Sequence, residues 1–161
     1  MKRKNKGFTL IELVVVLAII TTLSLVAVGA TKLYAVNQRK DSFKSEVYTF
    51  VRLLKVEDKV NGDFNITNGF LYEGNETTDP IERDTFIDLV LKLEPRLLNQ
   101  DSGTRNFDFY NNYGAVEFIY KEGDYIYVAT WQIADNTVDV YALTEGNSQY
   151  NYFKTKYQLE D

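Results

Sequence analysis

The chain has 161 residues, a formal net charge of −5 and neither cysteine nor histidine. Disulfides, thiolate chemistry, zinc sites built on Cys or His, and catalytic Ser-His or Cys-His pairs are therefore excluded. The length suits one ordinary domain, or a small domain with an appended segment. Without the four basic residues at its start the chain carries −9, which argues against nucleic-acid binding through a broad basic surface.

The first element is an apolar run from Phe8 to Ala30, whose 23 residues would form a helix about 34 Å long, enough to cross a bilayer core. Four basic residues precede it: Lys2, Arg3, Lys4 and Lys6. By the positive-inside rule, they keep the start in the cytoplasm and send the rest of the chain outward. One carboxylate, Glu12, lies inside the run, where a charge costs at least about 2.5 to 3.5 kcal/mol.

Three interpretations fit this segment. A secretory signal cleaved near residues 28–30 and a plain single-pass anchor both leave Glu12 unexplained. The third places a cytoplasmic cut between Gly7 and Phe8, which gives the chain a free ammonium on Phe8 four residues before Glu12. If the ammonium of one subunit meets Glu12 of another, each charge gains a partner in low dielectric and the pair fixes the register between subunits.

Residues 6–13, KGFTLIEL, together with the apolar helix that follows, resemble the N-terminus of the type IV pilin family, which includes the pseudopilins of secretion and competence systems. The resemblance implies that a prepilin peptidase cuts after Gly7 and methylates Phe8, and that Phe8 and Glu12 act in assembly. Many members have a proline in mid-helix, where this chain has Gly29. Many also close a C-terminal loop with a disulfide, which a chain without cysteine cannot form.

The resemblance implies an α+β pilin fold, in which a long N-terminal helix, membrane-spanning in its first half, packs on a small antiparallel β-sheet head. The expected parts are a leader (1–7), an apolar helix half (8–31), an amphipathic helix half (32–60) and the head (61–161). The implied partners are the peptidase, membrane lipid before assembly, identical or related subunits, and a separate assembly ATPase with its platform protein.

The leading functional interpretation is a major subunit of a type IV pilus: a single-pass precursor in the cytoplasmic membrane and an extracellular fibre after assembly. A minor pilin or a pseudopilin is the alternative within the family. The alternative from another class is a membrane-anchored or secreted binding module. Neither enzyme activity nor a cofactor is expected.

The helical pattern continues beyond the membrane segment. Apolar residues recur mostly at spacings of three, four or seven, the signature of one face of an amphipathic helix: Leu33, Val36, Phe43, Val47, Phe50, Val51 and Leu54. No Gly or Pro interrupts until Asn61-Gly62, a typical C-terminal stop. One helix over about 8–59 would be about 78 Å long.

In the head, residues 64–66 and 70–72 suggest one or two short strands. A helix is predicted over 80–94, with Asp79 as its cap, Pro80 in the first turn and Glu82 three residues after the cap. From Gly114 the period changes to two, and turns at 122–124 and 134–137 separate three strands of a meander: 116–120, 125–133 and 138–143. The tail, 150–159, is left open between an edge strand and a segment lying across the sheet.

Other motifs in the head have ordinary explanations. Four carboxylates lie near predicted loops, but without EF-hand spacing they indicate solvated surface rather than a calcium site: Asp101, Asp108, Asp135 and Asp139. Asn65 and Asn75 begin glycosylation sequons, a motif that is common by chance. The twelve tyrosines are typical of half-buried sheet packing or an interface.

Overall fold

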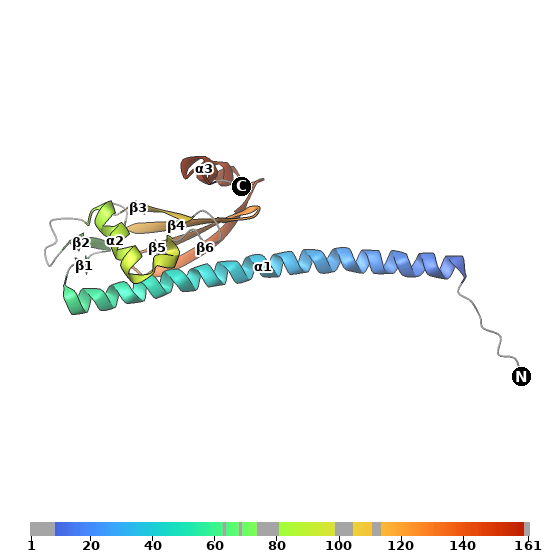
Figure 1. The fold of residues 1–161 in the computed structure, drawn as a ribbon, viewed down its shortest axis with the longest axis horizontal. Helices are drawn as coiled ribbons and strands as arrows, with labels where there is room; N and C mark the ends of the chain where they lie inside the picture. The colour runs from blue at the N-terminus through green and yellow to red at the C-terminus, as the bar shows by residue number, and fades with distance from the viewer. Residues whose placement is uncertain are drawn as a thin grey trace, which may run out of the picture. The chain divides into compact units, whose positions relative to one another are not determined.

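The computed structural model describes residues 9–62, 64–67, 69–73, 81–98, 105–110 and 114–159. The chain divides into two units, Met1–Gln38 and Arg39–Asp161, and helix α1 (Leu10–Asn61) contributes to both (Figure 1). The single long helix expected from the sequence is therefore confirmed. It ends where Gly62 adopts a φ of 66°, the left-handed conformation that glycine takes readily after a helix.

The core of the second unit forms between α1 and a β-sheet. The buried residues of this part of α1 lie on one face of the helix: Phe43, Val47, Phe50, Val51 and Leu54. The Phe50 ring makes edge contacts with Phe118 and Trp131 of the sheet and with Phe86 of α2 (Arg83–Leu93), with ring centroids 5.7–6.3 Å apart. A long helix packed on an antiparallel sheet is the α+β pilin-like arrangement that the resemblance implied.

The main sheet has four antiparallel strands in the order β3-β4-β5-β6. They are β3 (Arg105–Tyr110), β4 (Ala115–Glu122), β5 (Tyr125–Gln132) and β6 (Thr137–Thr144). The predicted meander corresponds to β4, β5 and β6. The predicted number of three strands was wrong, because the sheet has a fourth. The missing strand, β3, pairs along its whole length with β4, from Arg105 opposite Tyr120 to Tyr110 opposite Ala115.

Both faces of the sheet contribute to the core. Residues 118–121 of β4 and 126–129 of β5 are buried in succession, which cannot happen in a strand covered on one side only. Helix α3 (Ser148–Lys156) packs on the second face in one apolar cluster: Ile119, Ile126, Val128, Leu143, Tyr150, Phe153 and Leu159. Figure 1 shows α1 and α3 on opposite sides of the sheet.

The tail therefore forms a helix, and the edge-strand alternative is wrong. Its start is capped by Asn147, whose side-chain oxygen accepts a hydrogen bond of 2.9 Å from the N–H of Gln149. Tyr150, Phe153 and Tyr157 follow at spacings of three and four, so they share the face that meets the sheet. The cap and the spacing were both readable in the sequence.

A second, smaller sheet joins β1 (Phe64–Thr67) and β2 (Phe70–Glu73) as a hairpin, as the two short strands expected there suggested. The predicted helix exists, but it begins at Arg83 rather than at 80, and Glu82 is the capping position without a side-chain hydrogen bond. Ile81 is buried and its N–H donates to the Leu71 carbonyl at 3.1 Å, which keeps the chain extended just before the helix. Asp79 and Pro80 lie outside the described residues.

Three turns meet at one end of the sheet. A Cβ on Gly69, whose φ is +80°, would lie 2.9 Å from the Cβ of Ala134, and one on Gly114 would lie 2.7 Å from the Gly69 carbonyl oxygen. The Ile133 N–H donates to the Gly114 carbonyl at 2.8 Å. The β1–β2 hairpin is therefore held against the main sheet by backbone approach that only glycine permits.

Candidate functional site

The first turn of α1 contains the carboxylate that the sequence singled out. One oxygen of Glu12, Oε2, accepts hydrogen bonds from the Thr9 N–H at 2.8 Å and from the Thr9 hydroxyl at 2.7 Å. The Glu12 N–H in turn donates to Thr9 Oγ1 at 3.3 Å. This reciprocal arrangement is a capping box, which satisfies donors that a helix start otherwise leaves open.

The capping box gives Glu12 a partner within its own chain, a role that the sequence analysis missed. The signal was present, because Thr9 and Glu12 have the Thr-x-x-Glu spacing of the motif. A negative charge in the first turn also interacts favourably with the positive end of the helix dipole. Gly7 and Phe8 lie outside the described residues, so the pairing of the Phe8 ammonium with Glu12 stays a prediction.

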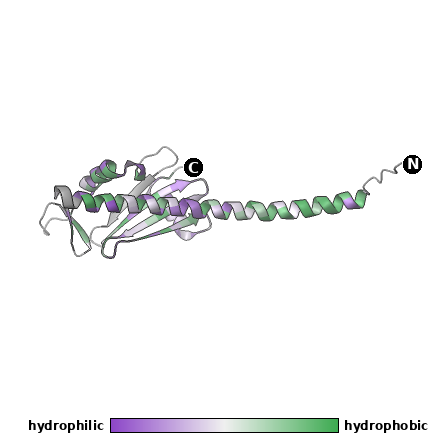
Figure 2. Ribbon diagram, turned by 90° about the horizontal axis from the view of Figure 1, so that it is seen from below, coloured by the Kyte–Doolittle hydropathy of each residue, from purple (hydrophilic) through white to green (hydrophobic). Residues whose placement is uncertain are grey.

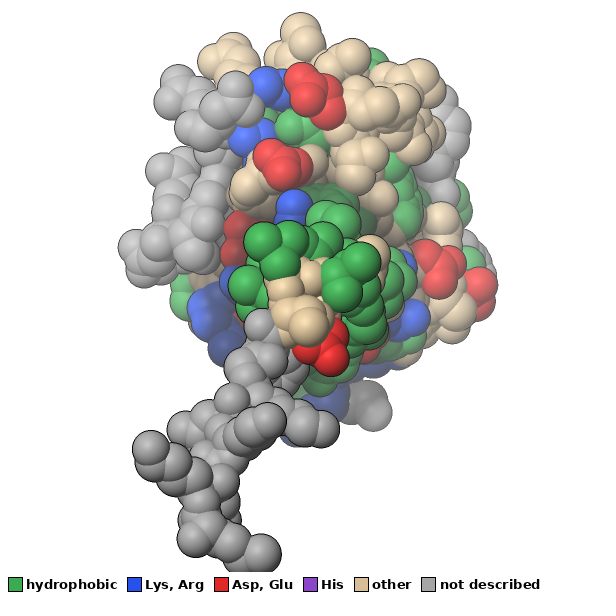
Figure 3. All heavy atoms as spheres, turned by 90° about the vertical axis from the view of Figure 1, so that its right-hand side faces the viewer, with side chains coloured by type: hydrophobic (Ala, Val, Ile, Leu, Met, Phe, Trp, Pro, Cys, Tyr) green, Lys and Arg blue, Asp and Glu red, His purple; other side chains and the backbone are tan. Residues whose placement is uncertain are grey.

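The next turns of α1 expose their apolar side chains. Leu10 is 81% exposed and Leu25 75%, and every other large apolar residue from Ile11 to Val28 is more than two-fifths exposed. Hydrophobic colours run along this part of the helix in Figure 2, and hydrophobic side chains gather around it in Figure 3. By length and composition, α1 is the one helix among the described residues that could cross a membrane.

The hydroxyl groups in this apolar stretch are all used within the helix. Each donates to a backbone carbonyl three or four residues earlier, at 2.8–2.9 Å: Thr21 to Ala18, Thr22 to Ile19, Ser24 to Ile20 and Thr31 to Val28. An unsatisfied hydroxyl is costly in an apolar environment, and these bonds remove that cost. Residues 13–31 therefore present a surface suited to lipid or to other apolar helices.

At the start of the second unit, a polar cluster ties α1 to the sheet. Arg39 Nη2 lies 2.5 Å from Glu122 Oε1, the Tyr120 hydroxyl donates to the same carboxylate, and the Tyr120 ring stacks on Tyr127 with centroids 5.5 Å apart. Burial, with the Glu122 charge adding to it, raises the pKa of the Tyr127 phenol, and Arg39 opposes the shift. The Phe43 ring, 5.8 Å from that of Tyr120, continues the contact into the core.

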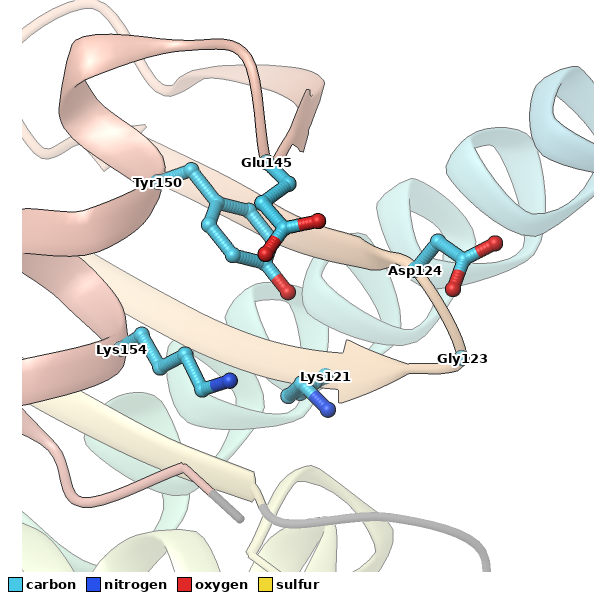
Figure 4. Close-up of a pocket in the computed structure, with 6 residues that line it drawn as sticks. All are labelled: Lys121, Gly123, Asp124, Glu145, Tyr150 and Lys154. Carbon is cyan, nitrogen blue, oxygen red and sulfur yellow. The ribbon is translucent and has the colours of Figure 1, made fainter. Parts of the chain in front are cut away.

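The head also contains a pocket of about 420 Å³ between α3 and two turns of the main sheet (Figure 4). Its lining mixes two cations, two carboxylates and a phenol: Lys121, Lys154, Asp124, Glu145 and Tyr150, with Gly123 at the turn. In Figure 4 the Lys154 ammonium and the Tyr150 hydroxyl point into the space between α3 and β4. A lining of balanced charge selects neither an anion nor a cation.

The carboxylates weighed as calcium ligands do not converge. Within the described part of the chain, no three His, Cys, Asp or Glu side chains form a group that could hold a metal ion. Asp135 is engaged in its own turn, where hydrogen bonds from the Thr137 hydroxyl and N–H, at 2.7 and 3.1 Å, lower its pKa. Asp139 is exposed on β6, while Asp101 and the side chain of Asp108 lie outside the described residues.

The comparisons with known proteins match the N-terminal part of this geometry. A family model described as the prokaryotic N-terminal methylation motif matches residues 2–28, which include Gly7, Phe8, Thr9 and Glu12. This motif, the class III signal peptide, is typical of type IV pilins and pseudopilins. The chain is pilin-like or pseudopilin-like. Comparisons with curated proteins and with solved structures found no match.

The motif has direct consequences for this pilin-like chain. It implies processing by a prepilin peptidase, and it is typical of a structural rather than an enzymatic family. The apolar helix that follows is consistent with a membrane-anchored prepilin.

Proposed function

We propose that this chain is the major structural subunit of a type IV pilus. The observation that carries the proposal is the exposed apolar surface of α1 over residues 10–28, directly within a methylation motif. Such a surface is stable only in lipid or against other apolar surfaces. In the precursor this surface lies in lipid, and in the fibre it packs against the apolar helices of other subunits.

In this proposal the prepilin peptidase cuts between Gly7 and Phe8, removes the basic leader 1–7, and methylates Phe8. Glu12 has one partner before assembly and gains a second in the fibre. Before assembly its carboxylate is held by Thr9 in the capping box. In the fibre it also accepts the Phe8 ammonium of a neighbouring subunit, which is possible because a carboxylate offers about four acceptor positions. The charged pair then fixes the axial register of the two helices.

The proposed parts of the chain divide α1 after residue 31, seven residues before the boundary between the two units. The apolar half (8–31) crosses the cytoplasmic membrane with the leader inside, as the basic residues of the leader favour. From Arg39 onward, the amphipathic half (32–60) lies in the same unit as the head (61–161). On assembly, burial against like helices replaces burial in lipid, so the net change in exposed apolar area is small. The work of extraction comes from a separate ATPase acting through a platform protein.

The test is to image cells that express the full chain together with a pilus assembly system, using an antibody raised against the protein. Labelled filaments at the cell surface, recovered by shearing and containing this chain as their main component, are the expected result. Protein found only in the membrane fraction, or as monomers in the medium, would favour a tethered or secreted binding module and contradict the proposal.

A further inference from the structure

Charge is distributed unequally within the second unit. Residues 39–61 of α1 hold six Lys or Arg against four Asp or Glu, which is +2. Residues 62–161 hold seven against eighteen, which is −11. Identical heads packed in a fibre would repel one another strongly unless the basic part of one copy meets the acidic part of the next.

Three cations of α1 form a stripe along one side of the helix. Lys44, Tyr48, Arg52 and Lys55 follow at spacings of four, four and three, so they share one side of the helix. Arg52 and Lys55 are exposed, Tyr48 is 40% exposed, and the Lys44 ammonium lies 5.9 Å from the Tyr48 ring centroid. None of the three cations forms an ion pair with another residue in the described part of the chain.

Two acidic residues of the same part of α1, Glu46 and Glu57, lie on another side of the helix. Glu57 forms an ion pair with Lys92 of α2, and Glu46, eleven residues earlier, lies about 20° from Glu57 around the helix. These carboxylates mark the side of α1 that faces α2. Lys44 and Lys55 each lie two positions from one of them, which is about 200° around the helix. The basic stripe therefore faces away from α2.

Helix α2 presents the opposite kind of surface. Asp84 and Asp88 are exposed, lie one turn apart on the same side of the helix, and form no ion pair with any described residue. Leu91, three residues later on the same side, is 49% exposed. Tyr48 and Val56, which is 53% exposed, offer matching apolar area beside the basic stripe. We name Asp84, Asp88 and Leu91 the acidic edge of α2.

We propose that the basic stripe of α1 in one copy docks on the acidic edge of α2 in a second copy. The inference rests on the proposed function, because it names the contact between heads in the fibre. The two surfaces face different directions within one copy, so a chain cannot satisfy both by itself or by pairing two identical patches. Such a heterologous contact joins copies head to tail, and it propagates into a helical filament when the rotation between copies does not close a ring. Asp41, one turn before the stripe, marks the N-terminal limit of its positive charge.

Charge reversal with mutual rescue tests this contact in cells that assemble the full chain. The variant Arg52→Glu/Lys55→Glu is expected to lower the yield of sheared fibres about tenfold or more, because like charges then face one another. Asp84→Lys/Asp88→Lys should lower it similarly. The chain with all four substitutions should recover to within about twofold of the wild type, since the pair is restored with its polarity exchanged.

The matched control is Lys154→Glu/Lys156→Glu, which makes the same change of charge on α3. It should keep the wild-type yield, and the amount of intact protein in the membrane should be equal for all variants. Full yield from the Arg52→Glu/Lys55→Glu chain would overturn the inference, as would a defect that the α2 reversal does not rescue. Wild-type cells without fibres would instead contradict the proposed function, so the two failures are distinguishable.

Discussion

Residues 10–38 and 39–61 of α1 belong to the same helix but differ in how their apolar side chains are distributed and exposed. In the first part apolar side chains occur on all sides and are exposed, and the hydroxyl groups are bonded to the helix itself. In the second part apolar side chains occupy one face and are buried against the sheet and α2. The second part is thus stabilised by packing in its own head, and the first part exposes a surface that needs an apolar environment.

The largest expected effect sharpens the role of the first part. Glu12→Ala should leave cleavage intact and reduce surface fibres at least about tenfold, because an uncompensated Phe8 ammonium would then be buried in the fibre. Glu12→Gln separates charge from capping, since glutamine can still accept the Thr9 hydrogen bonds of a capping box. If charge pairing is the main role, Gln fails as Ala does. Normal fibres from the Gln variant would show that capping alone suffices.

A matched pair of core truncations tests whether the two parts are stabilised separately. Phe50→Ala removes the ring that contacts Phe86, Phe118 and Trp131. This substitution should lower the free energy of unfolding of the head by about 3–5 kcal/mol. Leu17→Ala, at a side chain 53% exposed, should change it by less than about 0.5 kcal/mol. Trp131, the single tryptophan and fully buried, reports unfolding by fluorescence in detergent micelles.

Two glycines extend the comparison to the backbone. Gly69→Ala should destabilise the head by about 1–3 kcal/mol, because its φ is +80° and the new methyl group would meet Ala134. Gly29→Ala should stabilise the helix by up to about 1 kcal/mol, since nothing lies within 4 Å of the added Cβ and alanine is the better helix former. Urea denaturation of each variant measures the first effect, and helix content by circular dichroism the second. Equal changes in stability from the two substitutions would contradict the difference between the tightly packed head and the unpacked first part of α1.

The smallest expected effect concerns alkaline pH. Burial raises the pKa values of the Tyr127 and Tyr141 phenols, so folding favours their protonated forms. In the unfolded chain these phenols have a pKa of about 10, and below that pH their contribution to the stability of the fold is complete. The contribution is lost as the pH rises from there through their pKa values in the folded protein. Tyr127→Phe should make the loss above pH 10 shallower, whereas Tyr34→Phe, at a tyrosine 65% exposed, should leave it unchanged. A pH series of urea midpoints measures both.

The sequence predicted elements whose signals are local. The long helix, the hairpin and the strands β4, β5 and β6 follow from periodicity and turn residues. Strand β3 was missed because its pairing with β4 is a tertiary contact and its six residues are a short run with turn-forming residues on both sides in the sequence. The start of α2 was placed three residues early because Glu82 takes the capping position and the hydrogen bond from the Ile81 N–H to the Leu71 carbonyl keeps Ile81 out of the helix.

The candidate site divides in the same way. Glu12 stood out because a charge in an apolar run is visible in the sequence, and its capping box with Thr9 was also readable. The ion pair between Glu57 and Lys92 depends on how α2 packs against α1, which no sequence pattern showed. The separation of basic and acidic surfaces on α1 and α2 therefore required the structure.

The most direct test of the account is the mass and N-terminal sequence of the protein recovered from sheared fibres or, where none form, from membranes. The account predicts a mature chain that begins with N-methylated Phe8 and retains the whole of α1. A chain that begins at Met1, or one that begins after Ala30 and so lacks the apolar half of the helix, would contradict it.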